Sequence, residues 1–193
     1  MVLPLPAILS VLLGYLLGSI PSAVIIGKLF GDTDMRTEHD GRISAAAVHR
    51  RLGKIPYLFV VIMDISLSAL AVIIARSLTQ ENQGIMMTAG FAAVLGHNWS
   101  IFLKFRGGLG ATSIGGVLLV VATIQVLIAA VLAMIALLIL KKTGLSTGIA
   151  LFTTSVVILI TNGNQWLVAF PLILFMLMLL KRAQIARSFK LQV

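Results

Sequence analysis

The chain has 193 residues, of which 59% are hydrophobic and only 11% are charged, and its mean hydropathy is +1.08. Soluble domains contain about 25% charged residues, so this composition excludes an ordinary soluble protein and indicates a single integral membrane domain. We interpret the net charge of +9 as charge that sets membrane topology and attracts anionic lipid head groups, and we expect no nucleic-acid partner. The absence of cysteine excludes disulfides and thiolate metal sites, and neither a metal nor a cofactor is predicted.

Apolar stretches suited to crossing a bilayer follow one another along the chain. A membrane-spanning helix needs about 20 residues, and shorter stretches are expected to pack against their neighbours. The sequence therefore predicts an all-α integral membrane protein over residues 1–193, a compact bundle of about seven transmembrane helices, some of them short. The predicted spans are residues 3–27, 55–77, 84–103, 108–121, 124–140, 145–160 and 166–180.

The uncharged stretch 111–140 is open to two interpretations, one tilted helix or two short helices. Basic pairs precede it at 104–106 and follow it at 141–142. Basic residues beside membrane spans are retained in the cytoplasm, so a single crossing would place one of these pairs outside. Two crossings that turn near 122–125 keep every basic residue except Arg76 inside. This favours seven crossings of the membrane, with the N-terminus outside and the C-terminus in the cytoplasm.

The loop 31–54 is the longest polar segment of the chain. One interpretation is a solvated cytoplasmic loop with a short amphipathic helix at 43–52. The other is a loop that folds back onto the membrane domain and forms a site for a lipid head group or a phosphate.

Asp64 is an acidic residue inside a predicted span. It lies nine residues beyond the start of that span, which places it about 14 Å deep at 1.5 Å per residue. A carboxyl group at such depth is costly and marks a functional site unless it has a structural partner. Both interpretations stay open at this stage.

A histidine and several glycines meet at the cytoplasmic end of the third span. Glycines before a helix start expose backbone N–H groups, and with nearby basic residues they form an anion site. The segment is not a Walker A loop, because no Gly-Lys-Ser/Thr sequence follows the glycines. His97 could instead be a hydrogen-bonded interfacial residue. The candidates for phosphate binding are Arg36, Arg50, His97, Arg106, Gly107, Gly108 and Gly110.

Short motifs in the order and spacing of a known family run along nearly the whole chain. They stand at 18–22, 34–36, 50–54, 64, 96–97, 105–108 and 182–187. Together they resemble the bacterial PlsY family, the acyl-phosphate:glycerol-3-phosphate acyltransferases. The resemblance implies a seven-span fold in a bacterial inner membrane, with a cytoplasmic active site. It also implies an enzyme of phospholipid biosynthesis that transfers an acyl group from acyl phosphate to glycerol 3-phosphate, giving lysophosphatidic acid.

Several positions depart from the residues that the resemblance would supply, Arg42, Ala46, Ala47 and Leu67 among them, and four more stand where the resemblance implies handling of phosphate or protons. Asp40 stands in place of a serine and Leu109 in place of the Gly-Gly-Lys-Gly lysine, while Lys181 and Gln184 replace a histidine and an asparagine. Removing a cation from a phosphate site, or adding a carboxylate to it, costs powers of ten in rate. Standard activity is therefore expected to be absent or very low. The alternative is a catalytically inactive membrane homologue that binds a lipid phosphate or a protein partner.

Overall fold

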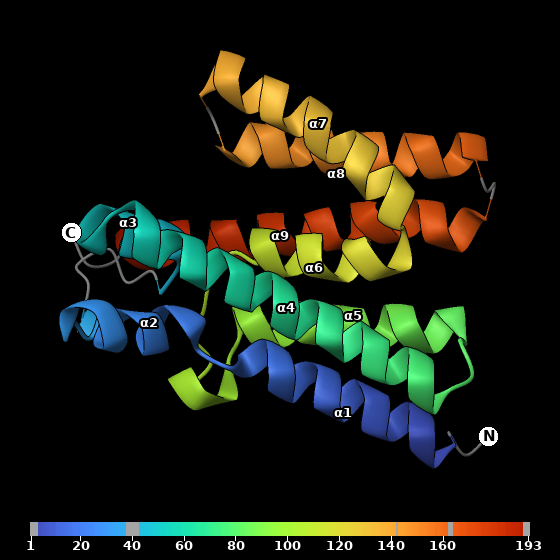
Figure 1. The fold of residues 1–193 in the computed structure, drawn as a ribbon, viewed down its shortest axis with the longest axis horizontal. Helices are drawn as coiled ribbons and strands as arrows, with labels where there is room; N and C mark the ends of the chain where they lie inside the picture. Colours follow the sequence, from blue (N-terminus) through green and yellow to red (C-terminus); the bar gives the residue numbers. More distant parts are fainter. Residues whose placement is uncertain (1–3, 38–42, 142, 162–163, 191–193) are drawn as a thin grey trace.

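The computed structural model describes residues 4–37, 43–141, 143–161 and 164–190. All regular structure in these ranges is helical, which confirms the prediction of an all-α membrane protein (Figure 1). The elements are α1 (Leu5–Ser19), α2 (Ser22–Gly31), the 3-10 helix η1 (Met35–Thr37), α3 (Ala45–Leu52), α4 (Lys54–Leu78), α5 (Gln83–Asn98), the 3-10 helix η2 (Ile101–Leu103), α6 (Ala111–Val121), α7 (Thr123–Leu140), α8 (Thr143–Thr161) and α9 (Gln165–Lys190).

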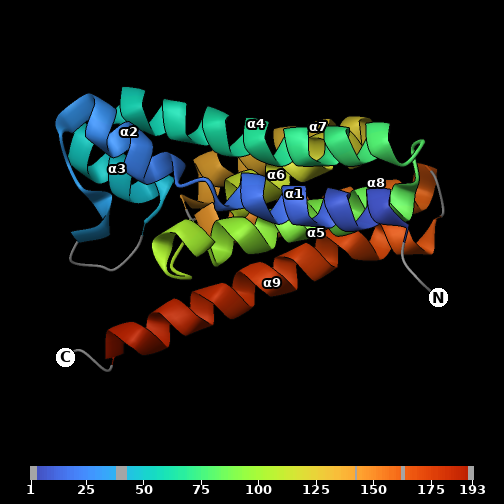
Figure 2. The ribbon, with the colours of Figure 1, turned by 90° about the horizontal axis from the view of Figure 1, so that it is seen from below.

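Six segments of the described chain are long and apolar enough to cross a membrane. They are Leu5–Gly31, Lys54–Leu78, Gln83–Leu103, Thr123–Leu140, Gly144–Thr161 and Gln165–Arg187. A seventh apolar helix, Ala111–Val121, is shorter. The start of α1 and the end of α9 lie at opposite ends of the bundle (Figures 1 and 2).

The stretch 111–140 is divided between two helices. Ala122 leaves the helical conformation with φ −146° and ψ 58°, so it ends α6 and precedes α7. The two helices run in opposite directions from this point (Figure 1). Ala129 is the one buried residue of α7, whose other residues remain at least partly exposed because the helix lies at the edge of the bundle.

The first predicted span, 3–27, is not one continuous helix. Ile20 and Pro21 separate α1 from α2, and proline lacks the backbone N–H that would continue the hydrogen-bond ladder. The break places Ser19 and Ser22 on either side of a bend inside the protein, and both side chains are buried. The last helix, α9, contains the predicted span 166–180 and continues beyond it to Lys190.

The packing of α1 on α5 depends on glycine. A Cβ atom at Gly18 would overlap the carbonyl oxygen of Ala93, and one at Gly14 would crowd that of Ala89. Small residues at such positions let two membrane helices approach closely. Figure 2 shows α1 beside α5, with α4 along one edge of the bundle and α9 along the other.

The described part of the loop 31–54 is packed against the bundle. Ser44 begins α3 as its N-cap and accepts a hydrogen bond from the backbone N–H of Ala47 at 3.4 Å. Ala47 and Val48 of α3 are fully buried in a cluster that includes Met35 and side chains of α2 and α4. The loop therefore folds back onto the membrane helices, as the second interpretation of this segment expected.

Candidate active site

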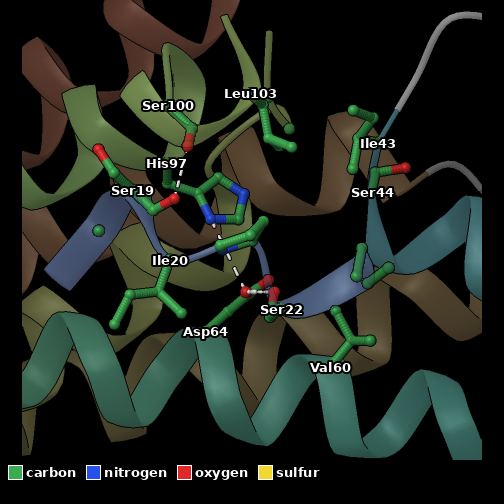
Figure 3. A pocket seen from close by; sticks show the side chains of 16 residues that line it. Ser19, Ile20, Ser22, Ile43, Ser44, Val60, Asp64, His97, Ser100 and Leu103 are labelled. Carbon is green, nitrogen blue, oxygen red and sulfur yellow. Dashed lines mark hydrogen bonds and ion pairs between the residues drawn. The ribbon is translucent and has the colours of Figure 1, made fainter. Parts of the chain in front are cut away.

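A small cavity lies where the α1–α2 break meets α4, α5 and the start of α3 (Figure 3). Its volume is about 20 Å³, which is room for roughly one water molecule. Sixteen residues line it: Gly18, Ser19, Ile20, Pro21, Ser22, Ala23, Ile43, Ser44, Ala45, Val60, Asp64, His97, Ser100, Leu103, Gly107 and Gly108.

Asp64 lies at the base of this cavity and is 3% exposed. Ser22 donates its hydroxyl to Oδ1 of Asp64, and Thr112 donates to Oδ2 at 2.8 Å. A buried carboxylate needs such donors, because its desolvation is otherwise costly. These hydrogen bonds join α2, α4 and α6 around one acidic group, so Asp64 has a structural role as well as a place in the site.

His97 is held between Asp64 and the glycines that follow η2. Its Nδ1 lies 3.7 Å from Oδ1 of Asp64, and its side chain is 14% exposed (Figure 3). Its Nε2 lies against Gly108 so closely that a Cβ atom there would overlap it. The Gly108 amide also donates to the His97 carbonyl at 3.2 Å. The imidazole is therefore oriented by a carboxylate on one side and by the backbone on the other.

The glycine-rich segment 107–110 leads directly into α6. Gly110 has φ +83° and precedes the first residue of α6 without a side-chain cap. A Cβ at Gly107 would overlap the His97 carbonyl, so glycine permits the close approach. The free N–H groups at the start of α6 are available to an anion. Beside this segment, Asn98 is fully buried, and its amide atoms have no hydrogen-bond partner within the described ranges.

The three arginines predicted to bind phosphate do not line the cavity. Arg36 forms a two-pronged ion pair with Asp34, with Nη2 2.7 Å from Oδ2 and Nε 2.9 Å from Oδ1. Hydrogen bonds from the Arg36 side chain and backbone lower the pKa of Asp34 to about 2. Arg50 and Arg106 are exposed. Asp40 lies outside the described residues.

The other three positions that depart from the family pattern, Leu109, Lys181 and Gln184, contact neighbouring side chains. Leu109 lies against the apolar core cluster. Lys181 of α9 is 3% exposed, and its Nζ lies 4.8 Å from the ring centroid of Trp99, a cation–π contact. The Trp99 indole N–H donates to Oε1 of Gln184 at 3.0 Å. Trp99 thus connects the end of α5 to α9.

Sequence reasoning missed the hydroxyl groups around the cavity. Ser22 and Thr112 bind Asp64, and Ser100 donates to the Ser19 carbonyl at 2.5 Å. Serine and threonine are common in membrane helices, where many only bond to their own backbone, as Ser10 and Thr123 do here. The sequence therefore held no signal that separated the site hydroxyls from the others.

The fold and the site define a multi-pass helical membrane protein. At one end of its bundle, the buried Asp64 is paired with the partly exposed His97 beside a glycine-rich loop. The family model described as glycerol-3-phosphate acyltransferase matches residues 8–190. The chain belongs to the glycerol-3-phosphate acyltransferase family.

Curated relatives and solved structures agree with this assignment. Glycerol-3-phosphate acyltransferase 1 of Dehalococcoides mccartyi is 34% identical over 178 residues, which cover 90% of this chain and 86% of that protein. Glycerol-3-phosphate acyltransferase 4 of the same organism is 41% identical over 150 residues, or 78% of this chain and 74% of that protein. The crystal structure of PlsY (YgiH) in its glycerol 3-phosphate form matches with a TM-score of 0.82 at 25% identity, covering 95% of this chain and 92% of that chain. The resemblance to the PlsY family is therefore confirmed.

Proposed function

We propose that this protein is a PlsY-like glycerol-3-phosphate acyltransferase of phospholipid biosynthesis, active at the cytoplasmic face of a bacterial inner membrane. Its substrates are acyl phosphate and glycerol 3-phosphate, and its product is lysophosphatidic acid. The observation that carries this proposal is the convergence of Asp64, His97, Gly107 and Gly108 on one cavity. The family assignment and the solved PlsY structures, titled as glycerol 3-phosphate and lysophosphatidic acid forms, support it.

The chemistry fits the residues around the cavity. The glycerol phosphate hydroxyl oxygen attacks the acyl carbonyl carbon, the bond from that carbon to the phosphate oxygen breaks, and inorganic phosphate leaves. The hydroxyl proton passes to the imidazole of His97, and Asp64 at 3.7 Å stabilises the imidazolium that forms. Phosphate oxygens bind to the backbone N–H groups at the start of α6 and in the glycine-rich segment, except that of Gly108, which is bonded to the His97 carbonyl.

An inactive homologue that binds a lipid phosphate is the second candidate. Two observations favour it. Leu109, in place of a lysine, packs against the apolar core, and Lys181 is in contact with Trp99. Both candidates bind an anion at the same loop, and they differ in whether an acyl group is transferred.

Purified protein given radiolabelled glycerol 3-phosphate and palmitoyl phosphate is expected to form lysophosphatidic acid slowly. We expect a rate about 10²–10³ below that of a relative with lysine at the position of Leu109, because one electrostatic contact to the reacting phosphate is missing. Thin-layer chromatography of the product measures the rate, and omission of palmitoyl phosphate is the control. Thermal stabilisation by glycerol 3-phosphate without any product would support the inactive homologue. Neither stabilisation nor product would contradict both candidates.

The seven-crossing orientation is tested by cysteine labelling, for which the cysteine-free chain is the blank. Gln80 and Gln165 are exposed at one end of the bundle, and Arg187 is exposed near the end of α9. In intact cells, Gln80→Cys and Gln165→Cys are expected to react with a membrane-impermeant maleimide, whereas Arg187→Cys reacts only after permeabilisation. Labelling of Arg187→Cys in intact cells would contradict the proposed orientation.

A further inference from the structure

Thr112 is the second residue of α6, and its hydroxyl joins this helix to α4. It donates to Oδ2 of Asp64 at 2.8 Å. The hydroxyls of Thr88, Thr123 and Thr154 instead donate to carbonyls four residues earlier in their own helices, which is the usual bond of a threonine in an apolar helix. The Thr112 hydroxyl therefore makes a contact between helices where these others make a contact within one helix.

The two oxygens of the Asp64 carboxylate have different partners. Oδ2 accepts from Thr112 of α6. Oδ1 accepts from Ser22 of α2 and lies 3.7 Å from Nδ1 of His97 on α5 (Figure 3). One carboxylate oxygen can accept from two donors, so Ser22 does not exclude the histidine. Because Thr112 and Ser22 hold opposite oxygens, together they fix the plane of the carboxylate.

The backbone that carries Asp64 is also held by α6. Ser68, one turn later in α4, donates its hydroxyl to the Asp64 carbonyl at 2.8 Å, and its Oγ lies 2.6 Å from Oγ of Ser113. Both serines are buried. A Cβ atom at Gly116 would overlap the carbonyl oxygen of Ile65. The first turns of α6 are therefore seated on the turn of α4 that carries Asp64, so the distance from α6 to the carboxylate is fixed by packing.

The orientation of this carboxylate decides which nitrogen of His97 carries a proton. The hydrogen-bonding partner of one ring nitrogen sets the protonation of the other. With Oδ1 of Asp64 facing Nδ1, the proton is favoured on Nδ1, and Nε2, which lies against Gly108, is left as the proton acceptor. At 3.7 Å the contact is longer than a hydrogen bond, and catalytic contacts of this kind often shorten when substrate binds.

We propose that Thr112 is a positioning residue for acyl transfer. By holding Oδ2, it keeps Oδ1 of Asp64 on Nδ1 of His97 and so keeps Nε2 ready to accept the hydroxyl proton. The inference rests on the proposed function, in which His97 is the base. Thr112 does not line the cavity, so it acts through Asp64 and touches neither substrate.

Nuclear magnetic resonance tests the positioning without any turnover. The chain has three histidines, so His39→Gln and His49→Gln leave His97 as the only one, and its ring is labelled with ¹⁵N. In this protein the Nδ1 chemical shift should be that of a protonated nitrogen. Adding Thr112→Val, which replaces only the hydroxyl by a methyl group, should produce a signal of unprotonated Nδ1. Adding Thr112→Ser, which keeps a hydroxyl, should leave the spectrum unchanged.

The transfer assay gives the second measurement. Thr112→Val should lower kcat at least about tenfold, because a hydrogen bond to an ionised group is commonly worth a factor of ten or more. KM for glycerol 3-phosphate and for palmitoyl phosphate should stay within about twofold, because neither substrate contacts residue 112. Thr112→Ser should restore kcat to within about threefold of the unmodified protein. Thr123→Val is the matched control, since the Thr123 hydroxyl bonds only to its own helix, and it should leave kcat and KM unchanged.

Three results would overturn the inference. One is an Nδ1 signal that Thr112→Val does not alter, and another is an unchanged kcat of this variant in an active enzyme. If Thr112→Val does not fold, Thr112→Cys takes its place in both measurements, because a thiol is only a weak donor. Loss of the fold in both variants is the third, since the hydroxyl would then only hold α6 on α4. Absence of product from the unmodified protein contradicts the proposed function instead, and the Nδ1 signal then still decides whether Thr112 positions the histidine.

Discussion

Replacing His97 by alanine is expected to lower kcat/KM for acyl transfer at least about 100-fold, because general base catalysis typically contributes 10²–10⁴. His97 is the one described histidine that lines the cavity, and Asp64 and Gly108 hold its ring in place. The rate of lysophosphatidic acid formation measures the effect. His49→Ala is the matched control, because His49 is exposed on α3 and does not line the cavity.

A second variant separates catalysis from folding. His97→Gln keeps a polar side chain of similar length beside Asp64, but an amide does not accept the proton. It should retain the thermal unfolding midpoint of the unmodified protein and still lose activity. Activity within threefold of the unmodified protein in His97→Gln would mean that His97 is not the base.

Gly18→Ala is expected to lower the free energy of unfolding by about 3 kcal/mol, at the upper end of the range for overpacked sites. The new Cβ atom would overlap the carbonyl oxygen of Ala93, and neither backbone can move without separating α1 from α5. Gly18 also lines the cavity, so the same shift should reduce activity.

The unfolding midpoint in detergent, by circular dichroism, measures this effect. Gly84→Ala is the matched control. Its Cβ would lie 3.4 Å from Oδ1 of Asn82, an ordinary van der Waals contact that needs no shift of the backbone. Equal unfolding midpoints for the two variants would show that α1 and α5 are packed less tightly in solution than in the structure.

Part of the candidate site was visible in the sequence. Asp64 stood out because a carboxyl group inside an apolar span is rare and costly, and His97 with its glycines stood out as a helix-start pattern. The structure brings Asp64, His97, Gly107 and Gly108 to one cavity. It places Arg36, Arg50 and Arg106 outside that lining, and Arg36 is paired with Asp34. Charge in a sequence does not show which side chain reaches a cavity and which remains in water.

Hydropathy and charge by themselves determined that this chain is an all-helical membrane protein. The free energy of transferring a segment into the bilayer is the sum over its own residues, so it can be estimated from the sequence alone. Motif order was enough to indicate the family. Only the tertiary structure decided that Ser22 and Thr112 bond to Asp64, and that Trp99 contacts Lys181 and Gln184. These contacts depend on the break at Pro21 and on how far each helix is rotated about its axis. That rotation is set by close packing between helices distant in sequence, which no local pattern encodes.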